Sequence, residues 1–182
     1  MRGDHNNPLA SSAAIGARRS DAAAMRVAPV DARLRSALLR LRVQPEQRDH
    51  VGRIGDLLAD AEHCPRSEPM AILRDNAPVG YYRIDPNARS VAGHDFDAPA
   101  LGLRGFFIDA DWQGLGWGGV ALAALLADLS ERHRHARLLV LGVACSNLAA
   151  MRLYRRAGFD DGGALYHGGR CGAQRLLLRA LP

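Results

Sequence analysis

Four glycines stand within the six positions 114 to 119, and this cluster constrains the fold of the chain more than any other feature. The apolar run Leu101–Ile108 precedes it, and an alanine- and leucine-rich run from Gly118 to about His133 follows it. Glycine destabilises helices, so its repetition at a helix start needs a reason. Uncovered backbone N–H groups at such a start form a binding site for an anion, for which a diphosphate is the natural choice. The segment therefore predicts a strand, an anion-binding turn and a helix.

The same glycines also fit the pattern of dinucleotide-binding folds. Gly114, Gly116 and Gly119 satisfy G-x-G-x-x-G. That pattern requires an acidic residue near the end of the next strand, where it holds the ribose. Here the next strand ends Val143-Ala144-Cys145 and offers no carboxylate. The chain after the glycines is also too short for a six-stranded doubly wound sheet, so this interpretation is disfavoured.

The first half of the chain predicts a strand, a helix and a hairpin. Leu39–Val43 alternates apolar and charged residues, as a half-buried strand does. Apolar residues then recur at helical spacing from Pro45 to Pro65. The apolar runs Met70–Leu73 and Val79–Ile84 flank turn-forming residues and predict an antiparallel hairpin. The polar segment from 85 to 99 is expected to be a loop.

The second half predicts alternating strands and helices. Leu138–Val143 is apolar throughout, which is typical of a strand buried on both faces. Asn147 is a suitable N-cap for the next helix, and Gly158 is a suitable left-handed stop. Two short strands are expected near Ala164–His167 and Ala173–Leu178. Together these elements predict an α/β fold.

The length of 182 residues predicts one domain, which we expect to span residues 31–182. Residues 1 to about 30 lack a sustained apolar period and are expected to form a disordered tail, and the native start could be Met1 or Met25. No apolar run of about 18 residues occurs, so we expect no membrane-spanning helix. The N-terminus also lacks the apolar region of a secretory signal.

Charge and cysteine content exclude several classes of function. All 24 basic residues are arginines and the net charge is +5, yet the arginines form no continuous run and have no interleaved aromatic set. Nucleic-acid binding is therefore not favoured. Cys64, Cys145 and Cys171 lie far apart, and neither they nor the histidines have metal-ligand spacing, so we expect no metal. Such cysteine usage favours a reducing, cytoplasmic location.

Two segments carry a resemblance to a known family. Gln113-Gly114-Leu115-Gly116-Trp117-Gly118 resembles the Q/R-x-x-G-x-G/A signature of the GCN5-related N-acetyltransferases (GNAT), and residues 147 to 159 resemble the family helix N-x-x-A-x-x-L-Y-x-x-x-G-F. The two motifs occur in the right order, separated by a helix and a strand. The resemblance covers about residues 38 to 180. Residues 45–47 and 80–82 are also similar to bacterial polyamine and small-amine acetyltransferases.

The resemblance implies a mixed, mostly antiparallel sheet of six or seven strands with about four flanking helices. The sheet would be splayed between the strand ending at Ile108 and the strand Leu138–Val143, and the thioester arm of acetyl-CoA would lie in the splay. Asn147 matches a coenzyme contact and Tyr154 the general acid. Backbone groups of Phe107, Ile108 and Asp109 would pair with the pantetheine arm, and the phosphates would be held by Gln113, Gly114, Leu115, Gly116, Trp117, Gly118 and Gly119.

The general base is the part of the chemistry that the resemblance does not supply. Some family members, including polyamine acetyltransferases, carry a glutamate nine residues before the signature Gln/Arg, and this chain has Arg104 there. By strand alternation Arg104 faces with Phe106 and Ile108, where it would favour an acceptor bearing a carboxylate or phosphate. A water held by Asp85, Asp109 or Asp111 could deprotonate the amine.

These features predict an N-acetyltransferase that passes the acetyl group directly to a primary amine of a small molecule or peptide. The alternative is a catalytically silent sensor or partner module that binds acyl-CoA. A covalent route through Cys145 is a less favoured variant of the enzyme. A homodimer is common in the family, and the residues identify no interface.

Overall fold

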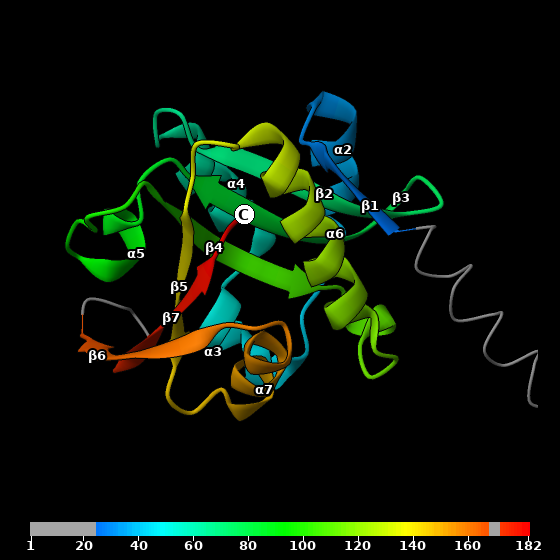
Figure 1. Ribbon diagram of the computed structural model, residues 1–182. Helices are drawn as coiled ribbons and strands as arrows, with labels where there is room; N and C mark the ends of the chain where they lie inside the picture. The colour runs from blue at the N-terminus through cyan, green and yellow to red at the C-terminus, as the bar shows by residue number, and fades with distance from the viewer. Residues whose placement is uncertain (1–24, 168–171) are drawn as a thin grey trace, which may run out of the picture.

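The computed structural model describes residues 25–167 and 172–182 and shows one mixed sheet with helices on both faces (Figure 1). The strand order is β1-β2-β3-β4-β5-β7-β6, and β4 and β5 are the one parallel pair in this sheet. The expected α/β fold with a mostly antiparallel sheet is confirmed. The strands are β1 (Met25–Pro29), β2 (Glu68–Arg74), β3 (Ala77–Asp85), β4 (Ala100–Ile108), β5 (Leu138–Ala144), β6 (Asp160–Tyr166) and β7 (Gln174–Ala180).

The helices divide into longer ones that cover the sheet and short turns that shape loops. One face packs against α6 and α7, and the other against α2, α4 and the single turn α5. Among the described residues, no helix is long and apolar enough to cross a membrane. The helices are α2 (Ala32–Leu38), α3 (Arg48–Val51), α4 (Ile54–Glu62), α5 (Arg89–Ala92), α6 (Trp117–Arg132) and α7 (Leu148–Arg156), and the 3-10 turns are η1 (Pro45–Gln47) and η2 (Ala110–Trp112).

The ordered domain begins earlier than the composition indicated. Residues 25 to 29, expected to belong to a disordered tail, form β1 and pair antiparallel with β2, from Met25 opposite Arg74 to Pro29 opposite Met70. A five-residue edge strand needs few apolar side chains, because its partner strand supplies the hydrogen bonds. A strand of this length is therefore too short to produce a recognisable alternation of apolar and polar residues. The part of the expected tail from 1 to 24 lies outside the described residues.

The prediction of a strand over Leu39–Val43 is wrong. A helix, α2, precedes it, capped by Asp31, whose Oδ1 accepts from Leu34 N at 2.7 Å. The following chain docks on the loop after β4: Arg42 N donates to Asp109 Oδ2 at 2.6 Å and Arg42 O accepts from Ala110 N at 2.7 Å. The alternation of leucine and arginine thus reflects a loop with one face against the protein.

The single helix expected from 45 to 65 is three shorter pieces, η1, α3 and α4. Gly52 has φ +84°, a left-handed conformation that ends α3 after one turn, and α4 begins two residues later. The loop expected from 85 to 99 likewise contains the single turn α5. The hairpin, the strand and helix around the glycine cluster, and the helix between Asn147 and Gly158 are confirmed.

The sheet is splayed where the resemblance implied. β4 and β5 pair from Ala100 opposite Leu138 to Leu103 opposite Leu141, after which both strands continue without a shared register. β5 meanwhile stays paired with β7 along its whole length. At the same point β4 contains a bulge at Gly105, which has φ +61°. The bulge re-aims the side chains that follow it.

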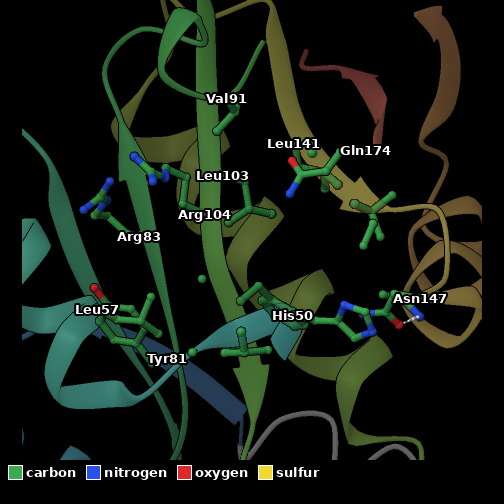
Figure 2. Close-up of a pocket in the computed structure, with 18 of the residues that line it drawn as sticks. His50, Leu57, Tyr81, Arg83, Val91, Leu103, Arg104, Leu141, Asn147 and Gln174 are labelled. Carbon is green, nitrogen blue, oxygen red and sulfur yellow. Dashed lines mark hydrogen bonds between the residues drawn. The ribbon is translucent and has the colours of Figure 1, made fainter. Parts of the chain in front are cut away.

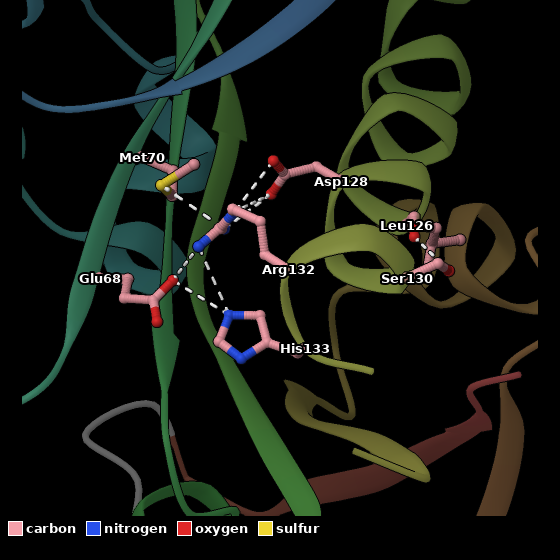
Figure 3. Close-up of polar contacts among 7 residues, drawn as sticks. All are labelled: Glu68, Met70, Leu126, Asp128, Ser130, Arg132 and His133. Atoms are coloured by element: carbon pink, nitrogen blue, oxygen red, sulfur yellow. Dashed lines mark hydrogen bonds and ion pairs between the residues drawn. The ribbon is translucent and has the colours of Figure 1, made fainter. Parts of the chain in front are cut away.

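The end of α6 is anchored to the sheet by an ionic cluster (Figure 3). Arg132 pairs with Asp128 at 2.6 Å and with Glu68 of β2, and Glu68 also lies 3.1 Å from His133 Nε2. Burial alone would raise the pKa of Glu68, but the hydrogen bonds from Arg132 and His133 hold it below its usual range. The cluster therefore fixes one end of the helix whose other end carries the glycine turn.

We expect Glu68→Gln to destabilise the fold by about 1 kcal/mol at neutral pH. Because the folded pKa of Glu68 is lowered, its contribution is present above the unfolded value and is lost as the pH falls through the folded one. The gap between the melting temperatures of variant and wild type should therefore close as the pH falls below the ordinary range of glutamate titration. Glu62→Gln, which breaks the more exposed pair with Arg35, is the control and should change stability less at either pH. An equal gap at both pH values would contradict the prediction.

Candidate functional site

The loop between β4 and α6 is held by hydrogen bonds of Asp109. Its carboxylate accepts from Arg42 N at 2.6 Å and from Asp111 N at 3.1 Å, so it is structural and not placed to hold a catalytic water. Its N–H donates to Val79 O at 2.8 Å, and its carbonyl accepts from Trp112 N at 2.9 Å. Both backbone groups of Asp109 are thus used within the protein.

The backbone of Ile108 faces the splay instead. Backbone groups of successive residues in a strand point to opposite edges, so the Asp109 bond to β3 directs the N–H of Ile108 toward the β5 side. Phe107 lies directly opposite Tyr81, so its backbone N–H points toward β3, as that of Asp109 does. Of the three residues expected to pair with an extended ligand arm, Ile108 is therefore the one that directs its N–H to the gap, while its carbonyl accepts from Gln113 Nε2.

Gln113 serves as a brace between two loops. Its side chain and that of Gln47 exchange two hydrogen bonds, at 2.9 and 2.8 Å, and its Nε2 also lies 2.7 Å from Ile108 O. The amide is therefore directed into the protein, so a phosphate role for Gln113 would fall to its backbone. The Gln47–Gln113 pair ties the η1–α3 segment to the start of the glycine turn.

The glycine turn has the open geometry of an anion site. Gly114 and Gly116 have φ +76° and +83°, and Gly116 is the N-cap of the 16-residue helix α6. A Cβ built at Gly114, Gly116 or Gly119 would meet no atom within 4 Å. Space and first-turn N–H groups therefore coincide at the positive end of the helix dipole. Trp117 is turned into the core, with the Arg74 guanidinium 4.1 Å from its ring centre, while Leu115 is exposed.

Helix α7 brings two further predicted residues to the splay. Asn147 caps it, with Oδ1 accepting from Ala150 N at 3.1 Å, which leaves the Nδ2 group to donate to a ligand. Tyr154 lies between the rings of Phe106 and Phe159, at centroid distances of 6.2 and 5.5 Å. Burial raises the pKa of Tyr154 well above its usual range, so the phenol keeps its proton and is a donor.

A cavity of about 390 Å³ occupies the splay and connects these residues to the α3–α4 face (Figure 2). Asn147, Tyr154 and Phe106 are among the residues that line it, and the glycines at 114 to 119 are not. The structure thus brings Arg104, Asn147 and Tyr154 to one cavity. Among the described residues, no group of three or more His, Cys, Asp or Glu side chains is arranged to hold a metal ion.

The predicted orientation of Arg104 is wrong. Arg104 is opposite Arg83, and Phe107 is opposite Tyr81, so the bulge at Gly105 places Arg104 on the face away from Phe106. Simple alternation fails because the bulge adds a residue to β4.

Two arginines and two aspartates form a neutral group at the cavity, which Arg83, Arg104 and Asp60 line and Asp85 does not. Arg83 lies 2.6 Å from Asp60 and 3.0 Å from Asp85, and Arg104 lies 3.9 and 3.6 Å from the same carboxylates. The role of Arg104 in binding an acceptor carboxylate stays a prediction. Asp85, expected as a water-holding residue, is fully occupied in this group.

Sequence reasoning missed the charged residues and the histidine that α3 and α4 contribute to the cavity. Asp49, Arg53, Asp56 and Asp60 line it from one side and recur at spacings of four, three and four residues. Such spacing places charged residues on one face of a helix, and it can be seen in the sequence. A charged helical face is usually only exposed to solvent, so the spacing alone does not indicate a site. His50 also lines the cavity, and no sequence signal marked it.

Comparisons with known proteins agree with this geometry. The sequence profile of the acetyltransferase (GNAT) family matches residues 32–159. The chain is 32% identical over 133 residues to the spermine/spermidine N(1)-acetyltransferase of Bacillus subtilis (strain 168), a match that covers 72% of this chain and 84% of that protein.

Solved structures share the fold at low sequence identity. An aminoglycoside N(6')-acetyltransferase from Legionella pneumophila has a TM-score of 0.67 at 13% identity, covering 87% of this chain and 92% of that one. YncA, an acetyltransferase from Salmonella typhimurium with its cofactor acetyl-CoA, has a TM-score of 0.58 at 18% identity, covering 87% and 95%. With the family profile and the 32% identical relative, the chain belongs to the GNAT family and is an N-acetyltransferase.

Proposed function

We propose that this enzyme transfers the acetyl group of acetyl-CoA to a primary amine of a small cationic molecule, with a polyamine as the favoured acceptor. The observation that carries the proposal is the single cavity that joins Tyr154 and Asn147 to the acidic α3–α4 face. Because Arg83 and Arg104 are paired with Asp60 and Asp85, their charges are offset, and Asp56 of α4 also lines this cavity. A carboxylate in the lining favours a protonated amine. The 32% identical relative named for spermine and spermidine supports the same class.

The residues present suit acetyl-CoA as the donor. The open backbone at Gly114, Gly116 and Gly119 would hold the diphosphate at the start of α6. Ile108 would pair with the pantetheine arm through its N–H, and Asn147 would donate through Nδ2. Acetyl-CoA supplies the acetyl group as an activated thioester. Tyr154, protonated, buried and part of the cavity lining, would donate a proton to the departing thiolate.

The experiment is mass-spectrometric detection of acetylated product from acetyl-CoA with spermine, spermidine, an aminoglycoside, amino acids and short peptides. We expect product from the polyamines, and we expect Asp56→Asn to raise the KM for spermine with little change in kcat. A preference for acceptors bearing a carboxylate would contradict the polyamine proposal and favour the Arg104 prediction. Binding of acetyl-CoA with no product from any acceptor would favour a silent sensor.

The donor site has its own test in Gly119→Ala. The substitution should stabilise α6 by up to about 1 kcal/mol, because alanine is the better helix former and its Cβ meets no atom within 4 Å. The same Cβ would keep a phosphate away from the backbone, so we expect affinity for coenzyme A to fall about tenfold. Calorimetric titration and thermal unfolding measure the two effects. Gly55→Ala in α4 is the matched control, and equal affinities in both variants would place the phosphates elsewhere.

Location and assembly remain proposals. Cys64 and Cys145 are free thiols in the described part of the chain, which is compatible with the cytoplasm expected from the sequence, and Cys171 lies outside it. A homodimer stays a prediction from the family resemblance. Size-exclusion chromatography with light scattering tests it directly.

A further inference from the structure

The proposed reaction needs a group that takes a proton from the acceptor, because an ammonium ion cannot attack a thioester. Tyr154 is unsuited to this task, since its burial keeps the phenol protonated. Arg104 stands where the resemblance places a carboxylate in some family members, and a guanidinium does not accept protons. Asp60 and Asp85 are each within ion-pair distance of both Arg83 and Arg104, so both carboxylates are engaged, and Asp85 is not among the residues that line the cavity.

His50 is the one imidazole among the described residues that line the cavity. It belongs to α3, and Figure 2 draws it among the side chains that line the cavity. Its Nδ1 is fully covered and has no hydrogen-bond partner in the described part of the chain. A fully covered nitrogen is out of reach of a ligand in the cavity, so the imidazole would meet an acceptor through its other ring nitrogen, Nε2.

Hydrogen bonds fix the segment that carries His50 to the loop between β4 and α6. The Gln47–Gln113 pair joins it to the glycine turn three residues before the histidine, with hydrogen bonds of 2.9 and 2.8 Å. Gly52 closes the turn on the other side, its N–H donating to Arg48 O at 2.8 Å. Gln113, a residue of the family signature, therefore helps to position His50 at the cavity.

We propose that His50 is the general base for the acceptor amine, with Gln47 as its positioning residue. The imidazole takes one proton from the ammonium and later releases it to solvent. The amine nitrogen then forms a bond to the thioester carbon and the carbon–sulfur bond breaks. The second nitrogen proton is lost as the amide forms, and the thiolate receives one proton from Tyr154, which is reprotonated in turn. The net products are the amide, the thiol and one proton.

Charged and titratable groups surround His50 from several elements. The short α3–α4 segment and the facing strands contribute Asp49, Arg53, Asp56, Asp60, Arg83 and Arg104 to the same cavity. Tyr81, Tyr154 and Tyr166 complete the titratable lining, and burial raises the pKa of Tyr81 to about 12, so it stays neutral in the working range. Of the side-chain types in this lining, imidazole is the one that most often serves as a general base.

The inference rests on the proposed function, and its test is the rate of acetyl transfer by His50→Gln. We expect kcat/KM for spermine to fall at least tenfold, with unchanged affinity for acetyl-CoA and an altered acid limb of the pH profile. The loss should shrink for a fluorinated amine that is already neutral at the assay pH, and added imidazole should partly restore His50→Ala. A structural role would give neither result. Folding is not expected to suffer, because the substitution removes an unpaired buried atom, and thermal unfolding checks this.

His63→Gln is the matched control, because this histidine lies at the end of α4, outside the cavity, with Nδ1 2.7 Å from Ala59 O. Gln47→Leu should lower kcat while keeping the wild-type pH profile. An active wild type with an equally active His50→Gln and the same pH profile overturns this inference alone. A wild type that acetylates no acceptor overturns the proposed function, and the inference with it.

Discussion

Replacing Tyr154 with phenylalanine should lower kcat about 100-fold while leaving the affinity for acetyl-CoA within about twofold. The ring would keep its contacts with Phe106 and Phe159, at 6.2 and 5.5 Å, so the packing of α7 is preserved. What is lost is the one hydroxyl proton, which the burial of Tyr154 retains well into the alkaline range. Stopped-flow or steady-state kinetics with calorimetric titration of coenzyme A measure the two quantities.

The control for this substitution is Tyr166→Phe, which removes another hydroxyl from the same cavity. Tyr166 is on β6, away from the α7 motif, and its substitution should change kcat less than threefold. If Tyr154→Phe keeps wild-type turnover, Tyr154 is a packing residue and the departing thiolate is protonated from another source. If affinity and turnover fall together, the hydroxyl acts in binding.

Replacing Arg83 with leucine should destabilise the protein by about 3–5 kcal/mol. The Arg83 side chain is 3% exposed and that of Asp85 6%, so the substitution leaves a buried carboxylate with Arg104 at 3.6 Å as its remaining charged partner. Urea unfolding measures the loss. The exposed pair between Arg89 and Asp95 is the control, and Arg89→Leu should cost less than about 1 kcal/mol.

A second substitution separates the buried charge from the lost packing. Arg83→Leu combined with Asp85→Asn should be more stable than Arg83→Leu alone, because the uncompensated charge is removed. Acid should also narrow the gap between Arg83→Leu and wild type, since protonation neutralises the carboxylate. A double variant as unstable as the single one would mean that packing, not charge, sets the cost.

Much of the fold followed from local patterns. The glycine cluster, the caps at Asn147 and Gly158 and the apolar run of β5 specify their elements through backbone conformation and burial, which depend on nearby residues. Strand β1 and the docked segment around Arg42 were missed because partners distant in the chain hold them. Periodicity carries no information about such partners.

The residues of the candidate site also divide into those that the sequence named and those that it did not. Residues 113 to 119 were named from the sequence because a ligand that binds backbone at a helix start leaves glycines at fixed spacing. Asn147 and Tyr154 were named because they match positions of the family helix. His50, Asp49 and Asp56 enter the cavity only because Gly52 breaks the helix and the Gln47–Gln113 pair docks it. The orientation of Arg104 depends on the bulge at Gly105.

The sequence by itself determined the family, the glycine turn and the chain order of most elements, because these depend on interactions between residues near one another in the chain. Only the tertiary structure decided which charged side chains line the cavity. There, side chains of α3, α4, β3 and β4 meet, and their charges offset one another through contacts such as that of Arg83 with Asp60. These pairs form only when the sheet folds, so the spacing of residues along the chain does not predict them.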